Sequence, residues 1–183
     1  MGPSPAPVPE TQRFHVAVVQ ASPVVFDRER TLAKVHALSG EAAGQGARLV
    51  LFPEAFVSAY PRGLDFGAVV GSRTDAGRGD FLRYLPLMRA AMYAKGVELY
   101  CAPTADPRDC WIASMRHIAV EGRCFVLSCN QFNRRSDFPS DYHSPFGDAP
   151  NTIMSRGGSC IVDPFGTVLA GPETDGEAIL VAE

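Results

Sequence analysis

Short apolar runs alternate with stretches of helical spacing along this chain. Residues 15–22 are apolar and mostly β-branched up to a proline, and residues 49–52 form a second apolar run, so both predict buried strands. Between them, residues 28–43 carry apolar side chains at helical spacing and are followed by glycines, which predicts an amphipathic helix. A strand, a helix and a strand form a βαβ unit, so we expect parallel strands covered by helices.

The second half of the chain repeats this alternation. Helices are predicted at 86–96 and 109–121, and strands at 97–103 and 124–130, which gives a second βαβ unit. Residues 131–153 contain several Pro, Asp and Asn residues and predict a long irregular loop. Residues 157–172 then predict a hairpin with its turn at 163–166, and residues 177–183 predict a final strand. The predicted fold class is α/β.

Length and composition favour one soluble domain. The chain has 183 residues, of which 46% are hydrophobic, so we expect one domain at 13–183 after a disordered, Pro-rich tail at 1–12. The net charge is −3 and no run of Lys or Arg is present, which argues against nucleic acid or an anionic membrane surface as a partner. No signal peptide pattern and no apolar stretch of about 20 residues occurs, so we expect a cytoplasmic protein.

The five cysteines form an odd set without C-x-x-C spacing. This pattern argues against a zinc ribbon and against a secreted disulfide scaffold. Most of the cysteines stand in apolar strand-like or helical segments, so we expect buried free thiols in a reducing compartment.

Glu54 is the residue whose position asks for an explanation. It follows an apolar run and Pro53, and it precedes Ala55 and Phe56. A carboxylate among apolar groups is costly unless it is paired or used, so Glu54 is either salt-bridged or functional. It is also expected at the carboxyl end of a strand, where α/β proteins bind their ligands.

Four segments of the chain, at residues 49–67, 92–106, 111–132 and 157–172, resemble the nitrilase branch of the carbon–nitrogen hydrolase superfamily. They occur in the order found in that family, and the resemblance covers nearly the whole chain after the tail. It implies an α-β-β-α sandwich. It also implies hydrolysis of a small organic nitrile to a carboxylic acid and ammonia, without a cofactor or metal.

In the family, a cysteine thiolate attacks the nitrile carbon, a glutamate acts as general base and a lysine stabilises the anionic intermediate. The family's glutamate stands in the "FPEAF" segment, which makes Glu54 the candidate catalytic base. The resemblance further suggests Tyr60 and Thr104 as substrate-binding residues near it, with Phe56 in the same loop.

The segments in which the family carries its lysine ("KLMPT"-like) and its cysteine ("CWEN"-like) are absent. The chain passes between regions that are well separated in the family, with a seam near Tyr84 and Leu85, so we expect an internally truncated sandwich. Its two lysines lie elsewhere, Lys34 on the first predicted helix and Lys95 at the end of a later one.

Other residues are weak substitutes for the missing nucleophile. Cys110 precedes Trp111 and so imitates the family's "CW", but it begins a helix that has its own place in the pattern. Cys101 lies at the end of a strand in a motif that the family carries in addition to its nucleophile. His117 is expected to serve packing or hydrogen bonding, and His143 to lie in a solvated loop.

Two hypotheses follow from these observations. The chain is either a nitrilase that hydrolyses a small organic nitrile, or a catalytically incomplete relative that arises as a shortened product or serves as an assembly partner. Under either one, the family suggests a homo-oligomer or association with a full-length homologue. A ligand-binding module that uses the residual pocket is a third, less specific alternative.

Overall fold

The computed structural model describes residues 13–60, 62, 89–142 and 144–183. Its helices are α1 (Arg28–Gly44), α3 (Cys110–Gly122), a helical stretch at 89–93 and the 3-10 turn η1 (Arg135–Asp137). Its strands are β1 (His15–Gln20), β2 (Ala47–Leu51), β3 (Leu99–Pro103), β4 (Phe125–Cys129), β5 (Phe132–Arg134), β6 (Ile153–Arg156), β7 (Ser159–Val162), β8 (Val168–Glu173) and β9 (Ala178–Ala182).

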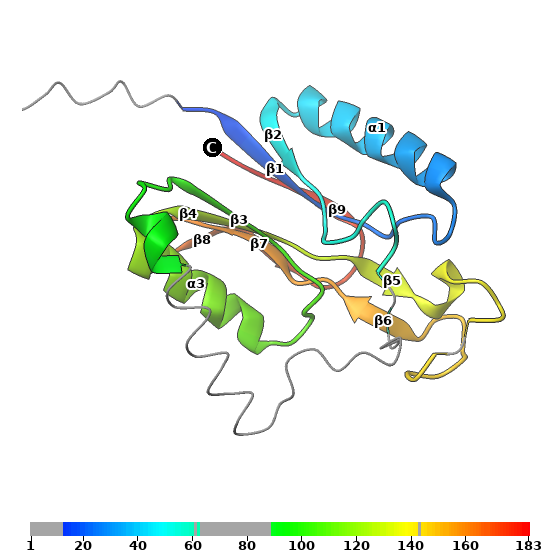
Figure 1. The fold of residues 1–183 in the computed structure, drawn as a ribbon. Coiled ribbons are helices and arrows are strands. Elements are labelled where there is room, and N and C mark those ends of the chain that lie inside the picture. Colours follow the sequence, from blue (N-terminus) through cyan, green and yellow to red (C-terminus); the bar gives the residue numbers. More distant parts are fainter. Residues whose placement is uncertain (1–12, 61, 63–88, 143) are drawn as a thin grey trace, which may run out of the picture.

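Two sheets face each other between two helical layers. One sheet has the strand order β2-β1-β9 and the other the order β3-β4-β7-β8. Helix α1 lies on the outer face of the first sheet and α3 on the outer face of the second (Figure 1). The expected α-β-β-α sandwich is therefore confirmed.

Alternating side chains along the central strands build the three apolar layers. Val16 and Val18 of β1 pack against Leu127 of β4 and Ile161 of β7 between the sheets. The next side chain along β1, Val19, points the other way and packs against residues of α1. The same alternation places Val126 of β4 against α3 in a third cluster. A period of two in each strand thus supplies both faces of its sheet.

Both predicted βαβ units are confirmed. Strands β1 and β2 pair in parallel, as do β3 and β4. The predicted hairpin also forms, since the amide of Asp163 donates to the carbonyl of Thr167 at 2.9 Å across the turn between β7 and β8. The last strand, β9, returns from the far end of the chain to pair antiparallel with β1.

The prediction that residues 131–153 form one irregular loop is wrong at its two ends. Strand β5 pairs antiparallel with β6, which begins at Ile153, and η1 follows β5 directly. The polar residues Asn133 and Ser155 are buried in these strands and are hydrogen-bonded there. Because these strands bury polar side chains, their sequence lacks the apolar alternation that identifies the other strands.

The Pro-rich tail at 1–12, the seam at Tyr84 and Leu85, and His143 lie outside the described residues.

Candidate functional site

The carboxyl ends of parallel strands meet at one end of the sandwich. Glu54 follows β2, Thr104 follows β3 directly and Asn130 follows β4 directly. In Figure 1 this end lies toward β5 and β6, which extend beyond the two main sheets. The structure therefore brings the loops that carry Glu54 and Thr104 to the same end of the molecule, as the parallel topology predicts.

The loop after β2 holds Glu54 by its backbone. The carbonyl of Glu54 accepts a hydrogen bond of 3.1 Å from Nε2 of Gln131, while the residue itself is exposed. Phe56 anchors the loop, because it is buried and its ring centroid lies 5.3 Å from that of Phe52. The next residue after Glu54, Ala55, has φ of 51°, and Ala59 has φ of 62°. Such left-handed alanines are strained, and strained backbone is common at functional sites.

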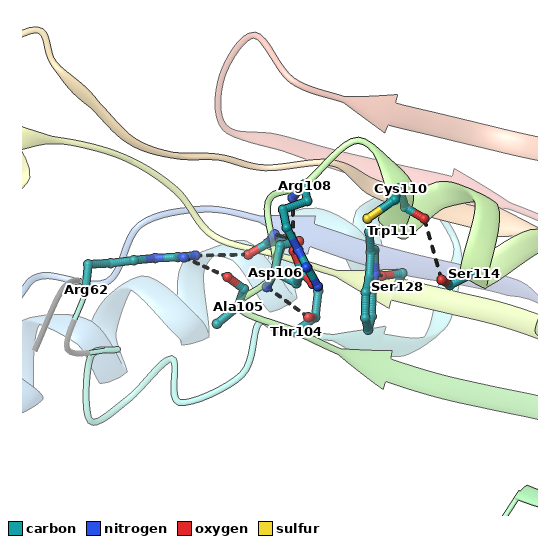
Figure 2. Close-up of polar contacts among 10 residues, drawn as sticks. Arg62, Thr104, Ala105, Asp106, Arg108, Cys110, Trp111, Ser114 and Ser128 are labelled. Atoms are coloured by element: carbon teal, nitrogen blue, oxygen red, sulfur yellow. Dashed lines mark hydrogen bonds and ion pairs between the residues drawn. The ribbon is translucent and has the colours of Figure 1, made fainter. Parts of the chain in front are cut away.

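Arg62 connects this loop to the other strand ends. Its side chain is only 6% exposed. One guanidinium nitrogen, Nη1, donates to the carbonyl of Ala105 at 2.6 Å, and the other, Nη2, donates to Oγ of Ser155 at 2.7 Å and to Oδ1 of Asn130 at 3.4 Å. Figure 2 shows the side chain extended toward the loop of residues 104–106. The guanidinium carbon also lies 5.2 Å from the centre of the Tyr60 ring.

Burial lowers the pKa of Arg62 from its ordinary value, and the charges of Tyr60, Asp106 and Glu54 oppose that shift. A buried guanidinium is stable only when acceptors and opposite charges surround it. Arg62 is thus a buried cation that lies over the ring of Tyr60 and interacts electrostatically with Glu54. Arg62 was not among the predicted site residues, although an arginine between Pro61 and Gly63 in the loop that carries Glu54 and Tyr60 is a usable signal.

Thr104 is buried, with 5% of its surface exposed, and its polar groups serve the loop after β3. Its amide donates to the carbonyl of Cys129 at 2.8 Å, and its hydroxyl accepts from the amide of Asp106 at 3.0 Å. Asp106 in turn pairs with Arg108 (Figure 2). Thr104 therefore fixes the shape of this loop beside the acceptor that Arg62 uses.

A network of buried amide and hydroxyl groups joins the two sheets beneath the loops. Nδ2 of Asn130 donates to the carbonyls of Asp106 at 3.0 Å and Gly157 at 2.9 Å. The backbone amide of Asn130 donates to Oγ of Ser159 at 2.9 Å. Gln20, at the end of β1, accepts from the amide of Ser159 at 3.0 Å. Because its members are largely satisfied, this network rigidifies the strand ends.

The cysteines only partly follow the expectation of buried free thiols. All five are free, but Cys101 and Cys110 are exposed while the other three are buried. Cys101 lies on β3, which is an edge strand, and Cys110 is the first residue of α3, as predicted. Edge position and helix start leave these two thiols uncovered, which the local apolar pattern does not reveal.

The buried thiols have structural partners. The Cys129 thiol donates to the carbonyl of Val19 at 3.0 Å and lies 3.3 Å from that of Leu51, and burial raises its pKa. Burial also raises the pKa of Cys160 to about 12. Cys101 is an exposed residue, but partial desolvation of its thiol raises its pKa above the ordinary value. A raised pKa disfavours the thiolate, which is the nucleophilic form.

Lysine and histidine side chains are likewise engaged elsewhere or exposed. Nζ of Lys34 on α1 forms an ion pair of 2.7 Å with Glu177, and Lys95 lies in the turn after the helical stretch at 89–93, as expected. His117 is exposed on α3, with Nε2 at 3.6 Å from a carboxylate oxygen of Glu121.

The indole of Trp111 donates to Oγ of Ser128 at 2.8 Å, which ties α3 to its sheet (Figure 2).

Within the described residues, no cluster of three or more His, Cys, Asp or Glu side chains is placed to hold a metal ion. In the same part of the chain, no helix has both the length and the apolar character of a membrane span.

Comparison with known proteins agrees with the geometry. The family model "Carbon-nitrogen hydrolase" matches residues 15–85 and 82–183. The chain belongs to the nitrilase branch of the carbon–nitrogen hydrolase family. The two matched segments of this carbon–nitrogen hydrolase meet at residues 82–85, where the sequence predicts the seam.

Two nitrilases illustrate the relationship. An aliphatic nitrilase from Sinorhizobium fredii is 35% identical over 265 residues, covering 93% of this chain and 86% of that protein. A bifunctional nitrilase/nitrile hydratase from Nicotiana tabacum is 34% identical over 272 residues, covering 94% of this chain and 78% of that protein. Both alignments are longer than the 183 residues of this chain, so part of each relative has no counterpart here.

Among solved structures, an amidase from Nesterenkonia superposes with a TM-score of 0.67 at 16% identity, covering 93% of each chain. A second structure of an amidase from Nesterenkonia has a TM-score of 0.65, covering 92% of this chain and 89% of the other. At this identity the likeness concerns the fold alone.

Proposed function

We propose that this chain is a catalytically incomplete nitrilase relative that keeps the general-base side of the family's site around Glu54. The placement of its nucleophilic and cationic side chains carries this proposal. All five cysteines and both lysines of the sequence lie within the described residues. Within this part of the chain, none of their hydrogen bonds and ion pairs joins them to Glu54.

Nitrile hydrolysis by this family's chemistry needs three groups within reach of one carbon atom. A thiolate must attack that carbon, a base must accept the thiol proton, and a cation must stabilise the nitrogen as it gains negative charge. In this proposal Glu54 is the base, and Tyr60 and Thr104 are the expected substrate contacts. The thiol of Cys129 is held between backbone carbonyls, and Lys34 pairs with Glu177.

The second candidate function is turnover of a small organic nitrile to its acid and ammonia. The similarity to the aliphatic nitrilase of Sinorhizobium fredii favours this substrate class. Under this alternative, one of the chain's own exposed cysteines, Cys101 or Cys110, serves as the nucleophile. Free cysteines in the described fold suit a reducing compartment, so we place the protein in the cytoplasm.

Ammonia release separates the two candidates. The purified chain is incubated with butyronitrile and with benzonitrile, and ammonia is measured against a sample without protein and against Glu54→Gln. We expect no ammonia above the protein-free sample from either nitrile.

Turnover that disappears in Glu54→Gln would overturn the proposal. The Cys101→Ser and Cys110→Ser variants would then identify the thiol that acts as nucleophile, since these are the two exposed cysteines.

A further inference from the structure

A small aromatic cavity lies beside the candidate site. Its volume is about 230 Å³, and it is formed where the loop before α1, the loop after β2 and the loop after η1 come together. Its lining residues are Val25, Phe26, Ser58, Ala59, Tyr60, Phe138 and Tyr142. Neither Glu54 nor Thr104 is among them, so the cavity shares only Tyr60 with the predicted site residues.

The Tyr60 wall is fixed by Arg62. The guanidinium of Arg62 lies over the Tyr60 ring and is itself held by acceptors after β3 and on β6. The hydroxyl of Tyr142, from the opposite wall, donates to the carbonyl of Arg62 at 2.5 Å. The two walls are therefore joined to each other, which keeps the cavity open at a defined width.

The opposite wall is fixed by a second buried arginine. Arg135 is 7% exposed, and its two Nη atoms donate to four carbonyls of the loop, at 2.9 to 3.3 Å. These carbonyls belong to Phe138, Pro139, Ser140 and Tyr142. The Phe138 and Tyr142 rings lie 4.8 Å apart, and this pair packs with Val25. Both aromatic side chains are thus preorganised by the backbone that carries them.

The third wall contains a strained phenylalanine. Phe26 has φ of 62° and is 70% exposed, and its ring centroid lies 6.3 Å from that of Tyr142. A bulky residue at such a φ is a backbone outlier, which persists only where the surrounding structure holds it. Here Thr31 holds the segment, because its hydroxyl bonds both the amide and the carbonyl of Val24 at 3.0 Å. These hydrogen bonds hold the segment that places the large aromatic ring of Phe26 at the rim of the cavity.

The chemistry of the lining defines the ligand. The described residues of the lining contribute four aromatic rings, two small apolar side chains and one serine, and none of them carries a carboxylate, ammonium or guanidinium. Ring edges and faces favour another aromatic ring over an alkyl group of the same size. An apolar cavity of about 150 Å³ is enough to hold benzene, so 230 Å³ fits one ring with a small substituent. A charged substituent would lose its hydration without gaining a partner.

We propose that this cavity is a binding site for an uncharged molecule with a single aromatic ring. The site does not depend on hydrolysis, because its walls are complete without a nucleophile. Binding is therefore tested with a probe that carries no nitrile or amide group.

The probe is benzyl alcohol, with benzoate as its charged counterpart. Saturation-transfer NMR on the wild-type chain should show binding of benzyl alcohol and no binding of benzoate. Intermolecular NOEs should connect the ring protons of the probe with the methyl groups of Val25, which locates it in this cavity without any variant. Absence of binding by benzyl alcohol, or NOEs to other parts of the chain only, would overturn the proposal.

A filling substitution and a matched control complete the test. Ser58→Phe places a ring in the cavity from an exposed position, and it should weaken benzyl alcohol binding by about tenfold or more. Ser114→Phe makes the same change at an exposed serine on α3, outside the cavity, and should leave the affinity unchanged. Equal affinity in Ser58→Phe and wild type would contradict the assignment. Circular dichroism of both variants checks that they are folded.

Discussion

At the scale of single residues, the strand-end site is organised by a buried cation. The guanidinium of Arg62 donates hydrogen bonds to Ala105 and Ser155, which follow it in the sequence by 43 and 93 residues and lie on two different parts of the fold. Its charge also acts on Glu54, Tyr60 and Asp106. A buried cation that the family motif around Glu54 does not single out is therefore part of the electrostatic surroundings of the candidate site.

Replacing Arg62 tests this role. Arg62→Met keeps the bulk of the side chain but leaves the carbonyl of Ala105 and the hydroxyl of Ser155 without their donors. Breaking a buried charged network of this kind costs about 3 kcal/mol of unfolding free energy. Urea denaturation should show this loss. Arg62→Lys should recover only part of it, because one ammonium cannot span the same acceptors.

Arg48→Met is the matched control. Arg48 is exposed, and its guanidinium carbon lies 5.5 Å from the centre of the Phe14 ring. The change should alter the unfolding free energy by less than about 1 kcal/mol. Equal losses in the two Met variants would show that Arg62 has no special structural role.

At the scale of elements, the turn between β7 and β8 is built by one aspartate. Oδ1 of Asp163 accepts from the amides of Phe165 and Thr167, both at 2.8 Å. Slight burial tends to raise the pKa of Asp163, but the hydrogen bonds from Thr167 and Phe165 outweigh it and lower the pKa below 3.8. The turn is thus stabilised by the charged form of the carboxylate.

The lowered pKa gives the turn a pH dependence of known sign. Stability from Asp163 is present above pH 3.8 and is lost as the pH falls through the lower pKa of the folded state. Asp163→Asn keeps an acceptor oxygen but does not titrate. The Tm difference between wild type and Asp163→Asn should therefore grow from pH 2.5 to about pH 5. A difference that stays constant over this range would contradict the assignment.

At the scale of the whole molecule, two strand edges lie on one side of the sandwich. β2 ends one sheet and β3 ends the other. Cys101 on β3 pairs with Leu127 on β4, so both side chains are on the face of the sheet that points toward the other sheet. Leu127 is buried there, but Cys101 is exposed. Within the described residues, the interior layer is thus exposed at Cys101 of β3. The two segments matched by the family model, 15–85 and 82–183, meet in the part of the chain between β2 and β3.

Uncovered edges of this kind favour association, because their free backbone groups can pair with another strand. We expect the mass measured by light scattering to rise with concentration from 19.7 kDa toward twice that value. Cys101→Lys places a charge on the β3 edge and should shift the protein toward the monomer. Cys110→Lys, at the other exposed cysteine, should leave the association unchanged. A measured mass of 19.7 kDa at all concentrations would show that the strand edges are already covered.

The sequence by itself determined the periodic elements and the family. Strands β1 to β4, helices α1 and α3 and the turn at Asp163 follow from local patterns of two and 3.6 residues, because neighbouring side chains decide which face is apolar. The position of Glu54 beyond β2 follows from the same local reasoning and from the motif around it.

Only the tertiary structure decided which distant residues meet. The pairing of β1 with β9, the burial of Arg62 and the short strands β5 and β6 all depend on partners far along the chain. Exposure of Cys101 likewise depends on what covers β3 and not on its own apolar neighbours. The physical reason is that burial and hydrogen bonding are properties of the spatial surroundings, which local periodicity does not contain.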